Sequence, residues 1–67
     1  MIAVTADNLW ELIAAHFQAK SYPEPQIRLF ASQGKKSVAI AWTDDDPFTW
    51  FHGDSEEEVL NEIKNMY

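Results

Sequence analysis

Hydrophobic side chains recur every three or four residues near both ends of the chain, which is the pattern of an amphipathic helix packed on one side. In the first of these segments Leu9, Ile13 and Phe17 form one apolar stripe. Thr5 or Asp7 stands where an N-cap is expected, because both residue types accept hydrogen bonds from free backbone N–H groups. A proline-rich connector follows, and a proline disfavours helical geometry in the residue before it. The pattern therefore predicts a helix that ends before the connector.

The second helical segment lies at the end of the sequence and begins with a capping box. Ser55 is expected to be the N-cap and to accept a hydrogen bond from the backbone of Glu58, whose own side chain is expected to reach back to Ser55. Val59, Leu60 and Ile63 then recur at helical spacing and predict a second apolar stripe.

Between the two helices the hydrophobic period changes to two, which is typical of strands with one buried face. Residues 26–32 and 37–43 both alternate, and a polar turn around Gly34 separates them. These two segments predict an antiparallel hairpin. Residues 48–52 form a third candidate strand after the acidic run at 44–46.

The third strand does not reveal which of its two sides is buried. Alternation puts Phe48 and Trp50 on one side, and Thr49 and Phe51 on the other. Either Phe48 and Trp50 or else Phe51 would therefore complete the core.

Together the five segments predict one α+β domain over residues 1–67 with the order αβββα. Two amphipathic helices and a three-stranded antiparallel sheet bury the most apolar area as two layers, with both helices on one face of the sheet. The core predicted besides the third strand consists of Leu9, Ile13, Phe17, Ile27, Leu29, Val38, Ile40, Trp42, Val59, Leu60 and Ile63.

Cysteine and long apolar segments are both missing from the sequence. Without cysteine the chain forms no disulfide and no thiolate metal site. No stretch approaches the roughly 20 apolar residues that cross a bilayer, and the first residues lack the basic start of a signal peptide. We therefore expect a cytoplasmic protein.

The net charge of −6 is concentrated in the last third of the chain. Residues 1–43 have a net charge of +1, whereas residues 44–67 have a net charge of −7. An acidic surface repels phosphate groups, since nucleic-acid affinity comes largely from Lys and Arg displacing counterions. We therefore expect no direct binding to nucleic acids or anionic membranes, and a protein partner, for example one with a basic nucleic-acid-binding surface.

Catalytic and metal-binding residues are not expected in this sequence. The run Asp44–Asp46 lacks the ligand spacing of a calcium loop, and His52 near Asp54 has no nucleophile arranged beside it. We predict no enzyme activity, no metal and no cofactor. The alternatives are a metal- or small-ligand-binding module built on Asp44–Asp46 and His52, and a structural subunit of a larger assembly.

The carboxylates of the last third are the first candidate binding surface. They either keep the protein soluble and cap the second helix, or they bind a basic patch of a partner by electrostatic complementarity. This predicted acidic surface consists of Asp44, Asp45, Asp46, Asp54, Glu56, Glu57 and Glu58.

The second candidate is the side of the sheet that the helices leave open. We expect Arg28, Phe30 and Phe51 to lie there beside Ala39 and Ala41. Arginine and aromatic residues are enriched at the centres of protein interfaces, so this face is a candidate for binding a partner or a second copy of the chain. The alternative is that the two aromatic rings only cover the alanines.

Two resemblances bear on function. The order αβββα resembles that of double-stranded-RNA-binding domains, whose second helix begins with lysines; the matching positions 56–58 here are glutamates. As a very small, acidic, cysteine-free domain, the chain also resembles phage or mobile-element accessory proteins such as anti-CRISPR and antirestriction inhibitors. That resemblance implies an inhibitor or modulator of a nucleic-acid-handling protein.

Overall fold

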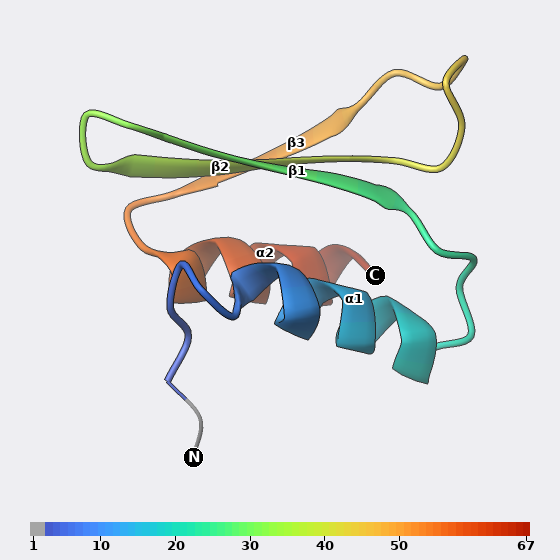
Figure 1. The fold of residues 1–67 in the computed structure, drawn as a ribbon, viewed down its shortest axis with the longest axis horizontal. Helices are drawn as coiled ribbons and strands as arrows, with labels where there is room; N and C mark the ends of the chain where they lie inside the picture. Colours follow the sequence, from blue (N-terminus) through green and yellow to red (C-terminus); the bar gives the residue numbers. More distant parts are fainter. Residues whose placement is uncertain (1–2) are drawn as a thin grey trace.

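The computed structural model describes residues 3–67. They form two helices and a three-stranded antiparallel sheet in the order α1 (Leu9–Ala19), β1 (Gln26–Ser32), β2 (Lys35–Ala41), β3 (Thr49–Gly53) and α2 (Glu56–Met66). Both helices lie on the same side of the sheet (Figure 1). Within residues 3–67 the other side of the sheet is covered by no further element. The predicted α+β fold and its αβββα order are confirmed.

The start of α1 differs from the prediction, since neither Thr5 nor Asp7 is the N-cap residue. That position belongs to Asn8, whose side chain closes the preceding turn and makes no capping bond. The Asn8 Oδ1 accepts a hydrogen bond from the Thr5 N–H at 2.8 Å, and its Nδ2 donates to the Ala3 carbonyl at 2.8 Å. Asparagine favours such local side-chain bonds to the backbone, and here they end the non-helical segment.

A residue in the left-handed conformation ends α1. Ser21 has a φ of 63°, and the Tyr22 N–H then donates to the Phe17 carbonyl at 3.0 Å. This arrangement satisfies carbonyl groups of the last helical turn and redirects the chain into the connector. It also brings the Tyr22 ring against the end of α1, where Tyr22 and Phe17 meet edge to face at 5.6 Å.

The sheet has the strand order β1-β2-β3, so each strand pairs with its neighbour in the sequence. A two-residue turn joins β1 to β2, because Ser32 pairs with Lys35. Both turn residues, Gln33 at 53° and Gly34 at 79°, have positive φ, as a type I′ hairpin turn requires. The predicted hairpin around Gly34 is confirmed.

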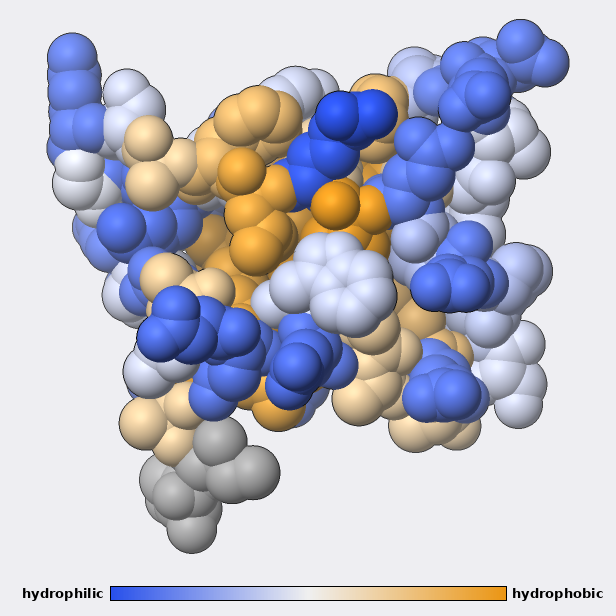
Figure 2. Space-filling view, viewed as in Figure 1, coloured by the Kyte–Doolittle hydropathy of each residue, from blue (hydrophilic) through white to orange (hydrophobic). Residues whose placement is uncertain are grey.

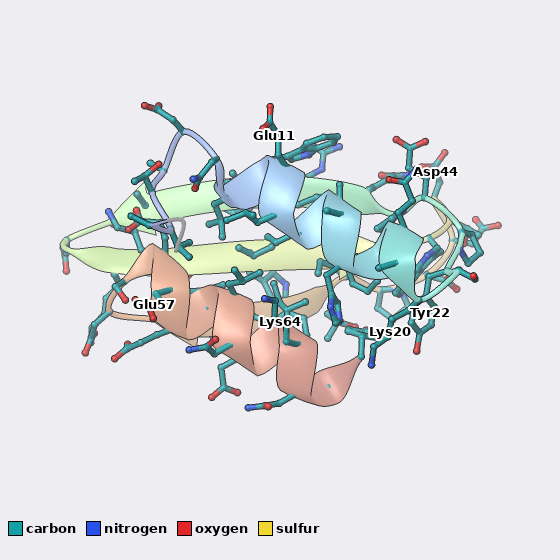
Figure 3. The ribbon with its side chains drawn as sticks, turned by 90° about the horizontal axis from the view of Figure 1, so that it is seen from below. Glu11, Lys20, Tyr22, Asp44, Glu57 and Lys64 are labelled. Carbon is teal, nitrogen blue, oxygen red and sulfur yellow. The ribbon has the colours of Figure 1, made fainter. Side chains whose placement is uncertain are left out.

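The core lies between the sheet and the two helices, which are side by side when seen from below (Figure 3). Ile27 and Trp42 pack against it but are only partly buried. Leu29 was predicted in the core and is 39% exposed, because it lies on the edge strand β1. The core residues are Leu9, Ile13, Phe17, Val38, Ile40, Phe51, Val59, Leu60 and Ile63.

A close contact joins β3 to α2. A side chain at Gly53 would place its Cβ 3.0 Å from the Glu58 Cβ and 3.0 Å from a methyl group of Val59. The capping box starts the helix with one difference from the prediction. The Glu58 N–H donates to the Ser55 Oγ at 3.3 Å as expected, whereas the Glu58 Oε2 accepts from the Asp54 N–H at 2.7 Å, one residue before Ser55. A side chain at residue 53 would therefore force its neighbours at the start of α2 to move by a few tenths of an ångström.

Candidate binding surface

The strand register decides which side chains share the open side of the sheet. Arg28 and Trp50 both pair with Ala39 of the central strand, and in the neighbouring row Phe30 and His52 both pair with Ser37. Directly paired residues of neighbouring strands point to the same side of a sheet. We call this surface the aromatic face and define it by Arg28, Phe30, Phe48, Trp50 and His52.

The prediction that Phe51 belongs to the open face is wrong. Phe51 pairs with Val38, points toward the helices and is only 6% exposed. Trp50 takes its place on the open face with 51% of its surface exposed. Both sides of β3 carry an aromatic residue, so alternation alone did not distinguish them, and the pairing with β2 does.

Three aromatic rings lie together at the centre of the aromatic face. Phe30 and Trp50 approach to 5.4 Å between ring centroids, and the indole of Trp50 is stacked parallel to His52 at 6.2 Å. Between them β2 offers only small side chains, and Ala39 and Ala41 are buried although they face this side. The rings therefore cover the alanines, which was one of the two alternatives for this face. Phe30 nevertheless remains 48% exposed, so the face is also accessible to a partner.

The polar groups of the aromatic face interact with its rings and with each other. The Arg28 guanidinium lies over the Phe48 ring at 5.7 Å, which is a cation–π distance. The Ser37 hydroxyl and the His52 Nδ1 are 2.9 Å apart and share a hydrogen bond. No carboxylate projects from the paired strand positions on this side, so the face lacks acidic groups in a chain of net charge −6.

The predicted acidic surface does not form as one surface. Figure 3 places Asp44 and Glu57 at opposite ends of the sheet. The reason is β3, which runs the length of the sheet between the acidic run at 44–46 and the start of α2. The seven carboxylates predicted to act together are therefore divided into two groups, which we describe separately.

Three of the four predicted carboxylates at the start of α2 are engaged within the molecule, and the fourth, Glu57, is exposed. Asp54 pairs with Lys35, and Glu56 lies 3.6 Å from the Lys36 amine. The hydrogen bond that the Lys35 amine donates to the Asp54 carboxylate raises the pKa of Lys35 above its ordinary value. Glu58 takes part in the capping box. For these residues the structure supports a role in helix capping and hairpin attachment.

The second group is the acidic turn, Asp44–Asp46, between β2 and β3. It is anchored at one side, where the Gln26 amide donates to the Asp44 Oδ1 at 2.8 Å. Thr43 accepts a hydrogen bond from the Asp46 N–H at 3.2 Å through its hydroxyl. All three carboxylates are exposed, and the turn rises from the sheet on the side opposite the helices (Figure 1). It therefore borders the aromatic face at one end.

A groove that the sequence did not predict lies between α1 and the connector. It has a volume of about 460 Å³, and the exposed rings of Trp10 and Tyr22 line it together with Ile27. Figure 2 shows the hydrophobic residues that gather over β1 and between β1 and α1. The residues were visible in the sequence, but the space between them depends on how α1 docks.

Among residues 3–67 no three His, Cys, Asp or Glu side chains are grouped to hold a metal ion. The described part of the chain also contains no helix that is long and apolar enough to cross a membrane. Scans against protein-family models, curated proteins and solved structures found no match to this chain.

Proposed function

We propose that this chain is a non-enzymatic protein-binding domain that binds through its aromatic face. The observation that carries the proposal is the pair of neighbouring rings, Phe30 and Trp50, each with about half of its surface exposed on the open side of the sheet. Two such rings offer a partner a large apolar contact at low cost in side-chain entropy, which is why aromatic residues dominate binding energy in interfaces.

The neighbourhood of the two rings supports the same proposal. Ala39 and Ala41 leave the sheet surface low, so a partner can approach the rings closely. Arg28 adds a planar cation, a group enriched at interface centres. The Ser37 hydroxyl and the His52 imidazole do lie beside each other, which was not expected from the sequence. Among the described hydrogen bonds, however, no third group orients the imidazole as a catalytic base.

A pull-down with a matched control tests this proposal. The immobilised protein is incubated with bacterial lysate, and each retained protein is identified, purified and measured for affinity. Trp50→Ala is expected to weaken binding roughly tenfold or more. The control is Trp10→Ala, which removes a ring of similar exposure (43%) from α1 and is expected to leave affinity unchanged. Equal effects of the two substitutions on every confirmed interaction would contradict the proposal.

The narrower hypothesis, an acidic inhibitor of a nucleic-acid-handling protein, now depends on the acidic turn. That turn is exposed and borders the aromatic face, whereas most carboxylates of the α2 start are engaged internally. If a basic partner binds there, Asp45→Lys should abolish capture, and rising salt should weaken it steeply. Glu57→Lys, at the opposite end of the sheet, is the control and should change little.

A further inference from the structure

We propose that the free edge of β1 binds an extended, basic segment of a partner protein as a fourth strand of the sheet. This site is separate from the aromatic face, and the inference does not depend on the proposed function. Its basis is the coincidence of three features along β1: backbone groups that the sheet leaves unpaired, apolar side chains beside open space, and carboxylates that form no salt bridge among the described residues.

The unpaired backbone groups follow from the register of the hairpin. The residues that flank its two-residue turn, Ser32 and Lys35, form a hydrogen-bonded pair, and such pairs alternate along an antiparallel ladder. Ile27, Leu29 and Ala31 therefore occupy the other positions, and their N–H and C=O groups point away from β2. Within residues 3–67, the hydrogen bonds outside the sheet ladder use none of these groups. A fourth strand would satisfy them.

The side chains of the same residues point to the helix side of the sheet. Ile27 pairs with Ile40 and Leu29 pairs with Val38, and both β2 residues are fully buried. Leu29 itself remains 39% exposed, because no strand continues the row beyond it. Figure 2 shows this hydrophobic surface over β1 and between β1 and α1. An added strand would therefore cover apolar surface as well as complete the hydrogen bonding.

The two edges of the sheet differ in how well they are protected. Proteins block edge strands by making them short, by placing proline or inward-pointing charges on them, or by covering them. β3 has five residues, follows Pro47, and has α2 packed against it. β1 has seven residues, pairs without a bulge from Gln26 to Ser32, and carries neither proline nor a charge on its helix side. β1 is therefore the edge that can accept another strand.

Two hollows lie beside this edge, one toward each end of β1. The groove of about 460 Å³ described above is lined by Ile27 and Trp10. A smaller hollow of about 160 Å³ is lined by Leu9, Leu29 and Ala31. Directly paired residues point to the same side of a sheet, so every second side chain of an added strand would point toward these hollows. The bound segment is therefore expected to carry apolar residues at alternate positions.

Carboxylates around the larger groove favour a basic segment. Glu24 lines the groove, and Asp44 is held beside the start of β1 by its hydrogen bond from Gln26. Figure 3 places Glu11 and Asp44 along the same edge of the molecule, beside α1 and away from α2. Within residues 3–67, none of these three carboxylates forms a salt bridge. Lysine or arginine residues of the segment would therefore find complementary charge here.

The basic residues near this edge do not neutralise those carboxylates. Arg28 points to the open side of the sheet, where its guanidinium lies over Phe48. Lys36 lines the smaller hollow, but its amine lies 3.6 Å from Glu56. Figure 3 places Lys20 on the side of α1 that faces α2. The surroundings of the larger groove are therefore acidic.

Selection from a phage-displayed library of random peptides, each slightly longer than β1, tests the inference. The selected peptides are expected to carry apolar residues at alternate positions and a net positive charge. Each peptide is then synthesised, and its affinity is expected to fall as the salt concentration rises. A selection that yields no peptide, or peptides without this alternation, would overturn the inference.

Amide hydrogen exchange measured by NMR shows which backbone groups a selected peptide uses. The amides of Leu29 and Ala31 should exchange rapidly in the free protein and slowly in the complex, whereas those of Arg28 and Phe30, which bond to β2, should be protected in both. A bound peptide that leaves the first pair unprotected would overturn the inference. Protection of that pair in concentrated protein without peptide would show pairing of two copies and would overturn the assignment of a basic partner.

A proline substitution tests the backbone contact separately from the side chain. Leu29→Pro removes an N–H that the sheet ladder does not use, so the fold should be retained, as a thermal melt checks. It should bind a selected peptide roughly tenfold more weakly than Leu29→Ala, which loses the same side chain but keeps the N–H. The same peptide N-methylated at the positions that face β1 should bind wild-type protein as poorly. Equal affinities in both comparisons would overturn the inference.

Two matched pairs of substitutions test the side chains. Trp10→Ala should weaken binding of a selected peptide roughly tenfold, whereas Trp50→Ala should leave it unchanged. Glu24→Lys should weaken binding several-fold, whereas Glu57→Lys, on α2, should change little. Equal effects within either pair would overturn the inference. A partner of the aromatic face would show the opposite response to the two tryptophan substitutions, so the two proposals stand or fall separately.

Discussion

Trp50 and Phe51 are adjacent in the chain and lie on opposite faces of the same sheet, and the two faces use their aromatic rings differently. On the helix side, Phe51 is buried in a core of aliphatic side chains and Phe17, and its ring lies 6.2 Å from that of Tyr67 at the end of α2. On the open side, Trp50 lies between Phe30 and His52 over small residues, and half of its surface remains in contact with water. The comparison separates side chains that hold the fold together from side chains that remain accessible to a partner.

The largest expected difference comes from removing these two neighbouring rings. Phe51→Ala leaves a cavity between the sheet and the helices and should lower the free energy of unfolding by about 3–5 kcal/mol. Trp50→Ala removes a half-exposed ring and should cost about 1–2 kcal/mol. Urea denaturation of both variants measures the difference. Equal losses would show that the open face contributes to stability as much as the core does.

The next two residues along β3, His52 and Gly53, allow the same comparison between the open side and the helix side of the sheet. Gly53→Ala adds one methyl group against the backbone and side chains at the start of α2 and should destabilise the fold by about 1–3 kcal/mol. His52→Ala on the open face should change stability by about 0.5 kcal/mol or less, since the ring is exposed. Thermal melts of the two variants check this, and a neutral Gly53→Ala would contradict the close approach of α2 to β3.

The smallest expected effect is a dependence of stability on pH that arises in the helix layer. Burial, together with the charges of Lys20 and Lys64, lowers the pKa of His16 below its ordinary value of 6.5. The unfolded chain then takes up a proton at higher pH than the folded chain does. The stability that depends on neutral His16 is fully present above about pH 6.5 and is lost as pH falls through the folded pKa. Urea midpoints measured across this range should show the decrease, and His16→Gln should remove it.

Much of the fold follows from local sequence patterns. The apolar stripes, the capping box at Ser55 and the hairpin turn at Gly34 are each set by residues close together in the chain, and the structure has all of them. The predicted side-chain cap at the start of α1 was wrong because Asn8, between the two candidates and Leu9, bonds to the preceding turn.

The binding surface was less predictable because it depends on contacts between distant segments. The alternating apolar residues of β3 are compatible with either side of the strand facing the helices. Only the pairing of Phe51 with Val38 shows which side is buried. Likewise the carboxylates of residues 44–58 are close in the sequence, yet β3 carries the chain from one end of the sheet to the other and separates them. The groove beside Trp10 depends on the docking of α1, which no local pattern specifies.

The pairing of each strand with its neighbour in the sequence has a consequence for the rate of folding. The β1–β2 hairpin closes over two residues, and a connection of seven residues brings β3 back along β2. Short loops cost little entropy to close, and chains dominated by such contacts reach the native state quickly for their size. We therefore expect the three strands to assemble early, with the docking of the two chain ends as helices onto the finished sheet as the slower event.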